Sequence, residues 1–393
     1  MKRIVVTIVL LFFTISGGLT AQITVSGILD SSVSLQAGAG DASASPVFSF
    51  GFEEYANLRF QSRIRDRAVV YGAVNFIAAS GDYAANAAQI AGLTTAIVAP
   101  GLSPTAFVEG ENYIAAIELE RLYFRLNGEF LDFDGGLLRL PFGYGQVWGS
   151  SDFLNPKNPL KPDARPRAVL GAGLSWYPAD ELKLLAFSVS GRNPLSRDSG
   201  ILAGISMDRH WDRASVQALY SFESPSDNSG YGIHRFGTSV KADIEVGFVM
   251  DALYTYNHEA GTELDGLSLS IGADYSFFDG NLIVLAEYLY NGETSSTSRK
   301  GGGSFSNNHY LYTGLTWRFN DFTNISAALI SAFDDVSFTP VISLNHDLFQ
   351  GAALTITAQI PMDRDLFSGD GNRGELGPIS HYFNCSARLR LRF

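Results

Sequence analysis

The sequence predicts an all-β protein whose strands, about eighteen in number, close into an antiparallel, up-and-down transmembrane barrel. Three observations predict this fold. Apolar residues recur at every second position along most of the chain, short and long connections alternate between these runs, and aromatic residues gather at the run ends. A period of two belongs to strands, whereas helices have a period of about 3.6. Sixteen strands is the alternative, because two termini on the same rim require an even number.

The composition favours strands and argues against one class of partner. Charged residues make up 17% of the chain and hydrophobic residues 46%, yet the long apolar run lies at the N-terminus, so the other apolar residues are dispersed. Forty glycines and twenty-eight phenylalanines are typical of tight turns and strands. The net charge of −12 argues against a nucleic-acid partner, because no basic face is present to neutralise phosphates.

The stretch 1–21 has the pattern of a secretory signal peptide. Lys2 and Arg3 are positive, the stretch 4–19 is apolar, and Ala21 is a small residue at the expected cleavage point. We therefore expect residues 1–21 to be removed near Ala21 and the barrel to extend over 22–393. A single membrane anchor is the alternative, but the apolar stretch is short for a span of about 20 residues.

The alternating runs begin directly after this segment. In the first run, Ile23, Val25 and Leu29 share one face while Thr24 and Ser26 share the other. Most runs have about ten to thirteen residues, near the ~9–11 that cross a bilayer at a tilt. The predicted strands are 23–35, 48–61, 65–79, 113–127, 130–140, 167–177, 181–190, 201–209, 212–223, 233–244, 246–257, 266–277, 281–291, 309–319, 322–333, 338–345, 351–360 and 379–393.

The connections and the aromatic residues distinguish a membrane barrel from a soluble sandwich. Short turns such as "NGEF" and "PADE" alternate with long loops such as "NGETSSTSRKGGGSFSNN". Trp176, Trp211 and Trp317 come just before short turns, and Tyr254 and Tyr288 lie toward the opposite strand ends. Two aromatic girdles are typical of membrane barrels. A soluble β-sandwich, the competing class, has strands of mostly about five or six residues with a polar outer face.

Two acidic residues interrupt the alternation of the run 113–127. Glu118 and Glu120 occupy positions that the pattern assigns to the apolar face. Either a β-bulge turns them inward or they lie above the hydrocarbon zone.

These features resemble those of bacterial outer-membrane barrels over the whole chain after residue 21. The resemblance implies a location in the bacterial outer membrane, and it implies that the terminal aromatic Phe393 is a signal read by the barrel assembly machinery. One stretch, "LRLPFGYGQVWGSSDFLNPKNPLKPD" at 138–163, is similar to a loop of porin-like families related to alginate-export channels. The matching residues are Gly145, Gln146, Trp148, Gly149, Asn155 and Pro156. Asn158 replaces an aspartate often found in that loop, which leaves a shared substrate open.

If the apolar face meets lipid, the opposite face lines the lumen and its charges segregate. Arginines are expected on one wall, at Arg59, Arg67, Arg121, Arg125, Arg139, Arg388, Arg390 and Arg392. Carboxylates are expected on the facing wall, at Asp243, Asp251, Asp274 and Glu287, with Lys241 as an exception. Facing walls of opposite charge would impose a transverse field on small polar solutes. An arbitrary distribution of polar lining residues is the alternative interpretation.

Two long connections are candidates for narrowing the lumen. The stretch 80–112 is too apolar to stand comfortably in water, so it is expected to fold inward or to pack on the rim or on another subunit. The stretch 141–166 is stiffened by prolines and has a basic character. The constriction residues predicted from the second stretch are Trp148, Asp152, Asn155, Lys157 and Lys161.

The resulting prediction is a porin for passive diffusion of small hydrophilic solutes or ions. The alternatives are a surface adhesin or receptor barrel that binds a partner through long loops, and a channel specific for acidic sugars. Several histidines lie toward the long-loop side without a motif linking them, so we predict no catalytic residue, no metal site and no cofactor. The expected partners are the lipid bilayer, the assembly machinery and small solutes, and a homo-oligomer stays open.

Overall fold

The computed structural model describes the strands and some of the connections between them. The described residues are 22–38, 47–64, 67–81, 106–110, 113–155, 157, 159–160, 168–190, 200–225, 232–257, 266–292, 306–364, 374–377 and 383–393. In this part of the chain, no helix is both long enough and apolar enough to span a membrane.

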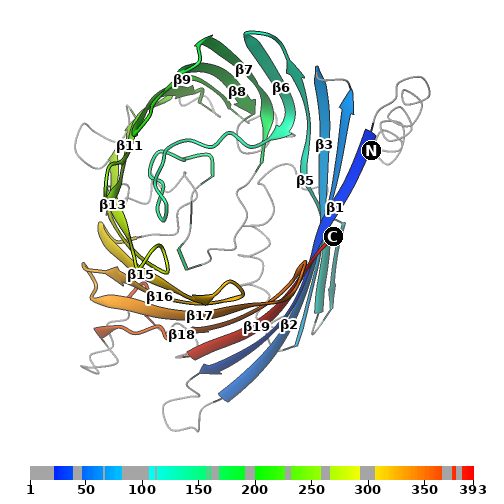
Figure 1. Ribbon diagram of the computed structural model, residues 1–393, viewed down its shortest axis with the longest axis vertical. Helices are drawn as coiled ribbons and strands as arrows, with labels where there is room; N and C mark the ends of the chain where they lie inside the picture. The colour runs from blue at the N-terminus through cyan, green and yellow to red at the C-terminus, as the bar shows by residue number, and fades with distance from the viewer. Residues whose placement is uncertain are drawn as a thin grey trace.

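The strands form one closed antiparallel ring (Figure 1). The sheet has nineteen strands, and β4 pairs only with β5, so the ring itself has eighteen (19 − 1). The ring closes because the last strand, β19, pairs with both β18 and β1. Closure leaves no free sheet edge, which is the condition for a sheet to exist in lipid. The predicted fold class and strand number are confirmed.

The strand bounds agree closely with the predicted runs. They are β1 (Gln22–Gly38), β2 (Val47–Ile64), β3 (Ala68–Gly81), β4 (Ala106–Gly110), β5 (Tyr113–Asn127), β6 (Leu131–Leu138), β7 (Val169–Ala179), β8 (Leu182–Ser190), β9 (Ile201–Trp211), β10 (Ala214–Glu223), β11 (Ile233–Asp243), β12 (Gly247–Asn257), β13 (Leu267–Phe277), β14 (Leu282–Asn291), β15 (His309–Asn320), β16 (Thr323–Ala332), β17 (Ser337–Phe349), β18 (Ala352–Gln359) and β19 (Phe383–Arg392).

The wall is irregular where β5 meets β6. β6 pairs only with the C-terminal part of β5, from Leu122 to Asn127, and ends at Leu138. The five-residue β4 pairs with the N-terminal part of β5, from Tyr113 to Ile117. β4 lies inside a stretch that the sequence predicts to be a connection, because five residues are too few for a clear period. The early end of β6 lets the following chain enter the barrel.

A β-bulge at Glu120 explains the acidic residues of β5. Ala73 of β3 faces Arg121 while the next residue, Val74, faces Leu119, so Glu120 has no partner of its own. The extra residue turns Glu118 and Glu120 to the inner face, where they are 9% and 7% exposed. Of the two sequence interpretations, the bulge is the one observed.

The outer surface is apolar and carries the predicted aromatic residues. Trp176, Trp211 and Trp317 are 48%, 46% and 42% exposed just before their turns. Outward-facing residues of β2 include Phe48, Phe50, Phe52 and Phe60, all exposed. Glu54 interrupts this apolar row and accepts a hydrogen bond of 2.7 Å from the hydroxyl of Ser31 on β1.

The closing seam between β1 and β19 combines a polar inner pair with an aromatic outer contact. On the inside, Arg390 donates two hydrogen bonds of 2.7 Å to the carboxylate of Asp30. On the outside, the ring of Phe393 lies against Gly27, where an added Cβ would come within 2.5 Å of the ring. The two residues also exchange backbone hydrogen bonds. The last strand therefore presents arginines to the interior and apolar residues to the exterior, as the alternation predicts.

Candidate functional site

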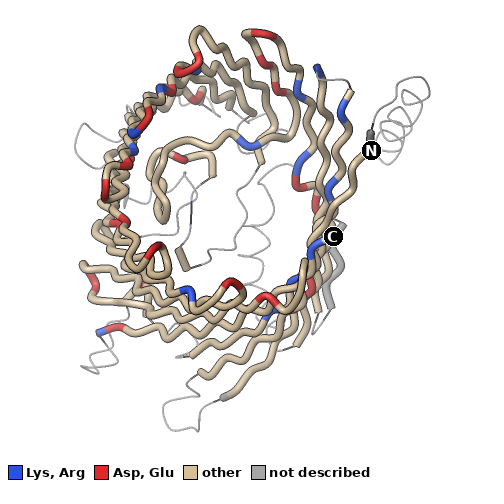
Figure 2. The backbone as a smooth tube through the Cα atoms, in the orientation of Figure 1, with Lys and Arg blue, Asp and Glu red and all other residues tan. Residues whose placement is uncertain are grey.

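The segment that follows β6 lies inside the barrel. We call residues 139–155 the inner loop. It leaves the wall at β6, crosses the interior and turns back near β11 and β13 (Figures 1 and 2). Loops inside a barrel decide how much of its interior is filled, and among the described residues this loop is fixed to one side of the ring. The inner loop and the wall that faces it are therefore the candidate site.

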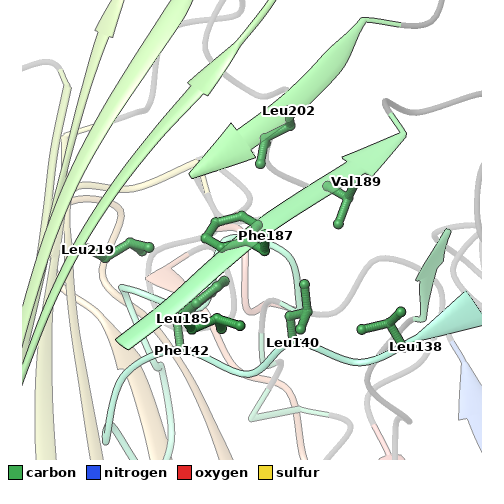
Figure 3. Packing of buried hydrophobic residues seen from close by; sticks show 8 residues of the cluster. All are labelled: Leu138, Leu140, Phe142, Leu185, Phe187, Val189, Leu202 and Leu219. Atoms are coloured by element: carbon green, nitrogen blue, oxygen red, sulfur yellow. The ribbon is translucent and has the colours of Figure 1, made fainter. Parts of the chain in front are cut away.

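The first part of the inner loop is held by apolar packing. Leu140 and Phe142 are 6% and 3% exposed, and they pack on inward-facing residues of β8 to β10 (Figure 3). The cluster comprises Leu138, Leu140, Phe142, Leu185, Phe187, Val189, Leu202 and Leu219. An apolar inner wall would be unfavourable against water. Burial of that wall therefore favours the docked position of the loop.

The turn of the inner loop is held by two carboxylates of the wall. Every backbone N–H from Tyr144 to Trp148 donates to one of them: the first two to Asp251 on β12, and the next three to Glu287 on β14. These donor–acceptor distances are 2.8 to 3.0 Å. Asp251 and Glu287 are both 0% exposed. Hydrogen bonds to ionised groups are the stronger kind, so the two carboxylates fix this turn firmly.

Two glycines make this close approach feasible. Gly143 has φ of +79°, and a Cβ there would lie 2.5 Å from the Asp251 carboxylate. A Cβ at Gly145 would lie 2.8 Å from the same carboxylate and from the backbone of Gly149. Glycine alone both tolerates a positive φ and leaves room for the carboxylate.

The tip of the inner loop is anchored by Trp148, which is 4% exposed. Its indole Nε1 donates to the backbone oxygen of Glu287 at 3.1 Å, and its ring lies 5.5 Å from that of Tyr310. The surrounding cluster comprises Val147, Trp148, Leu289, Tyr310, Ile330, Ala332 and Leu376. Because Leu376 comes from the connection between β18 and β19, two long connections meet inside the barrel.

That second connection is attached to the wall by its own polar network. The backbone N–H of Glu375 donates to Asp335 at 2.6 Å, and its carboxylate accepts from Asn307 and Tyr310. The backbone N–H of Leu376 donates to Ser337 at 3.0 Å. Sequence reasoning did not identify this segment as part of the site. Its glycine-rich sequence predicts only a loop, and its wall partners are recognisable only in the folded chain.

The returning part of the inner loop contains the remaining predicted constriction residues. Ser151 lies 3.1 Å from Ser239 of β11, hydroxyl to hydroxyl. Asn155 donates to the backbone oxygen of Leu140 at 3.0 Å and to Asp152 at 3.1 Å, and Lys157 donates to the backbone oxygen of Gly145. The contact of Ser151 fixes the loop to the wall, whereas those of Asn155 and Lys157 cross-link the connection internally. Lys161 and residues 82–105 of the other candidate stretch lie outside the described residues.

Because Asp152 is buried in the docked inner loop, we predict that docking depends on pH. Burial raises the pKa of its carboxyl to about 7, partly offset by hydrogen bonds and by Lys157. An undocked aspartate has a pKa near ~3.9, so the docked form holds a proton that the undocked form releases between about pH 4 and 7. Docking therefore weakens as the pH rises through this window. We expect larger single-channel conductance at the upper end of the window, and a flatter pH profile in Asp152→Asn. An unchanged profile in this variant would contradict the assignment.

The strand arginines of the predicted basic wall lie on the inner face, and the ion pairs of the described residues involve four of the eight predicted arginines. Arg125 pairs with Asp134 at 2.6 Å, and Arg390 pairs with Asp30. Arg139, at the start of the inner loop, pairs with Glu120 at 2.6 Å.

Two further arginines of this wall have neutral or shared partners. Arg121 lies 3.4 Å from Glu120 and has its guanidinium 4.6 Å from the ring centre of Tyr71. Arg59 donates to the side-chain oxygen of Asn57 at 2.5 Å. Glu120 is shared by two arginines, but Glu118 lies on the same inner face, so the charges beside β5 balance: Arg121, Arg125 and Arg139 against Glu118, Glu120 and Asp134. Arg67 and Arg392 are exposed at strand ends, and Arg388 is half-buried.

The predicted acidic wall requires a correction. Asp251 and Glu287 do face inward, but the inner loop covers them completely, so they are not water-exposed lining charges. Asp274 accepts a hydrogen bond of 2.8 Å from Gln146, and Asp243 pairs with Lys241 at 3.2 Å. Figure 2 shows acidic and basic residues on both sides of the ring. The alternation of polar and apolar residues along a strand gives the face of each side chain but not the place where a loop docks. It therefore could not predict that the inner loop covers Asp251 and Glu287.

Comparisons with known proteins agree on the fold. Neither a protein-family model nor a curated protein matches this sequence. Among solved structures, OccAB4 of Acinetobacter baumannii is similar with a TM-score of 0.54 and 12% identity, covering 95% of this chain and 98% of the other. OccK5 (OpdH) of Pseudomonas aeruginosa has a TM-score of 0.52 and 10% identity, covering 94% and 98%.

OpdQ of Pseudomonas aeruginosa is similar to the same degree, with a TM-score of 0.51, 12% identity and coverage of 95% and 97%. At these identities the likeness concerns the fold alone. The chain thus has the fold of the all-β transmembrane barrels of the porin class. The resemblance of residues 138–163 to alginate-export-like families stays a prediction.

Proposed function

We propose that this chain is an outer-membrane porin that admits small hydrophilic solutes by passive diffusion. The observation that carries the proposal is an inner loop docked on one side of a closed ring, with polar and charged residues on the facing wall. Wide barrels leave an aqueous lumen unless loops fill it. The passage proposed here runs between the inner loop and the wall formed by β16 to β19 and β1 to β5.

The same reasoning supports a location in the bacterial outer membrane. The apolar outer surface and its exposed tryptophans fit a bilayer with the short turns on the periplasmic side. We propose export with cleavage near Ala21, and recognition of Phe393, which is 66% exposed on the outer face, by the barrel assembly machinery. A homo-oligomer remains compatible with this arrangement.

The test is conductance of the purified, folded barrel in a planar lipid bilayer. We expect stepwise single-channel currents, and swelling of liposomes in small neutral sugars with a size cut-off. A correctly folded barrel that inserts yet carries no current would refute the channel function and favour the surface-receptor alternative.

A channel for acidic sugars is a more specific version of the proposal. Tyr71 and Tyr123 stack on the inner face with ring centres 5.4 Å apart, and Arg121 lies over Tyr71. An aromatic face beside a guanidinium suits a ring-bearing anion. Faster liposome swelling in a sugar acid than in the uncharged sugar of the same size would support this version, and equal rates would exclude it.

A further inference from the structure

The two buried carboxylates have a role that their position on the wall does not by itself suggest. We propose that Asp251 and Glu287 are positioning residues that set both the width of the passage and the sign of its charge. This inference rests on the proposed channel function. It differs from the expected transverse field, in which the same carboxylates would act directly on passing solutes.

The width of the passage depends on how the inner loop is attached to the barrel wall. The backbone N–H groups from Tyr144 to Trp148 all end on these two carboxylates. Loss of both carboxylates would leave five consecutive backbone donors without these acceptors, which is unfavourable in the docked position. The loop would then favour an undocked position in water, and the passage would widen on the β12–β14 side.

The charge of the passage depends on which carboxylates the inner loop covers. A carboxylate hydrogen-bonded to neutral amides keeps its charge, but at 0% exposure neither Asp251 nor Glu287 presents an oxygen to water. On the facing wall, Arg59 and Arg121 remain partly exposed, as does Arg139 at the start of the inner loop. The docked loop therefore keeps two carboxylates away from water, and undocking would uncover two negative charges opposite the wall that carries Arg59 and Arg121.

Two kinds of variant should undock the inner loop, one that removes the two carboxylates and one that keeps them. Asp251→Ala with Glu287→Ala removes the acceptors and the charges together. Gly145→Val leaves both carboxylates in place but puts a side chain where a Cβ would lie 2.8 Å from Asp251. We expect roughly twofold larger conductance in both variants, since each opens the same side of the lumen. Only Gly145→Val should shift the reversal potential in a salt gradient toward cations.

A matched control and a locked variant complete the test. Asp243→Ala removes an exposed carboxylate of the same wall that pairs with Lys241, so conductance should stay at the wild-type value. Ser151→Cys with Ser239→Cys, hydroxyls 3.1 Å apart, should form a disulfide in a Cys385→Ala background. Added to Gly145→Val, this disulfide should restore the narrow passage when oxidised and release it when reduced.

The outcomes are distinguishable from failure of the proposed function. Wild-type conductance in both undocking variants, with folding verified by resistance to SDS without heating, would overturn the inference while the porin function stands. Larger conductance with the same reversal potential in both variants would overturn its charge component. A wild-type barrel that carries no current would refute the channel function itself.

Discussion

The double variant Arg59→Gln with Arg388→Gln is expected to shift the ion selectivity of the proposed channel toward cations. Both side chains lie on the inner face near the closing seam, on β2 and β19, the two strands that flank β1. Arg59 contacts the neutral amide of Asn57, so its replacement removes a cation without leaving a buried carboxylate behind. The measurement is the reversal potential under a salt gradient, which should shift toward the cation value.

A charge-neutral change at the same seam is the control. Arg390→Gln with Asp30→Asn removes one cation and one anion that are bonded to each other at 2.7 Å. Because the net charge of the wall does not change, the reversal potential should stay near that of the wild type. Equal shifts in both double variants would mean that side-chain size, rather than charge, sets the selectivity.

The ring of strands could be predicted from the sequence because the alternation that marks each strand depends only on residues within that strand. A strand in lipid must alternate, so residues such as Leu29 and Asp30 reveal their faces without knowledge of the fold. The bulge at Glu120 shows the limit of this reasoning. The pattern indicates that an irregularity is needed, but only the pairing of β3 with β5 shows which residue is the extra one.

The docking of the inner loop could not be predicted in the same way. Trp148, Asp152 and Asn155 were identifiable as loop residues of interest, whereas the wall residues that fix the loop, Glu287 for Trp148 and Ser239 for Ser151, lie more than 80 positions further along the chain. Asp251 and Glu287 have the same alternating context as a lining carboxylate. An available signal was the apolar inner face of β8, where Leu185, Phe187 and Val189 occupy lumenal positions that water would not favour.

The inner loop and the wall beneath it therefore form one unit. The wall supplies apolar surface and buried carboxylates that only a docked loop can satisfy, and the loop supplies backbone donors and glycines that only this wall can accept. Buried polar groups without partners are rare because they are costly. In the proposed channel, residues predicted from the sequence to line the lumen would instead hold the loop that shapes it, and the facing arginines would act on the solutes.

Trp148→Ala is expected to enlarge the passage by freeing the tip of the inner loop. The indole is 4% exposed among Leu289, Tyr310, Ile330 and Leu376, and its Nε1 donates to the wall. Truncation of a buried Trp costs about 3–5 kcal/mol, so the tip should lose much of its packing on the wall. We expect larger single-channel conductance and a higher size cut-off for neutral sugars.

The control for this substitution is a tryptophan of the same wall that faces outward. Trp211 stacks under Arg209 at 4.9 Å on the outer surface, far from the inner loop. Trp211→Ala should therefore leave the conductance and the size cut-off unchanged, although it weakens anchoring at the interface. If Trp148→Ala kept the narrow cut-off, apolar packing of the tip would be dispensable, and docking would depend on Asp251 and Glu287 alone.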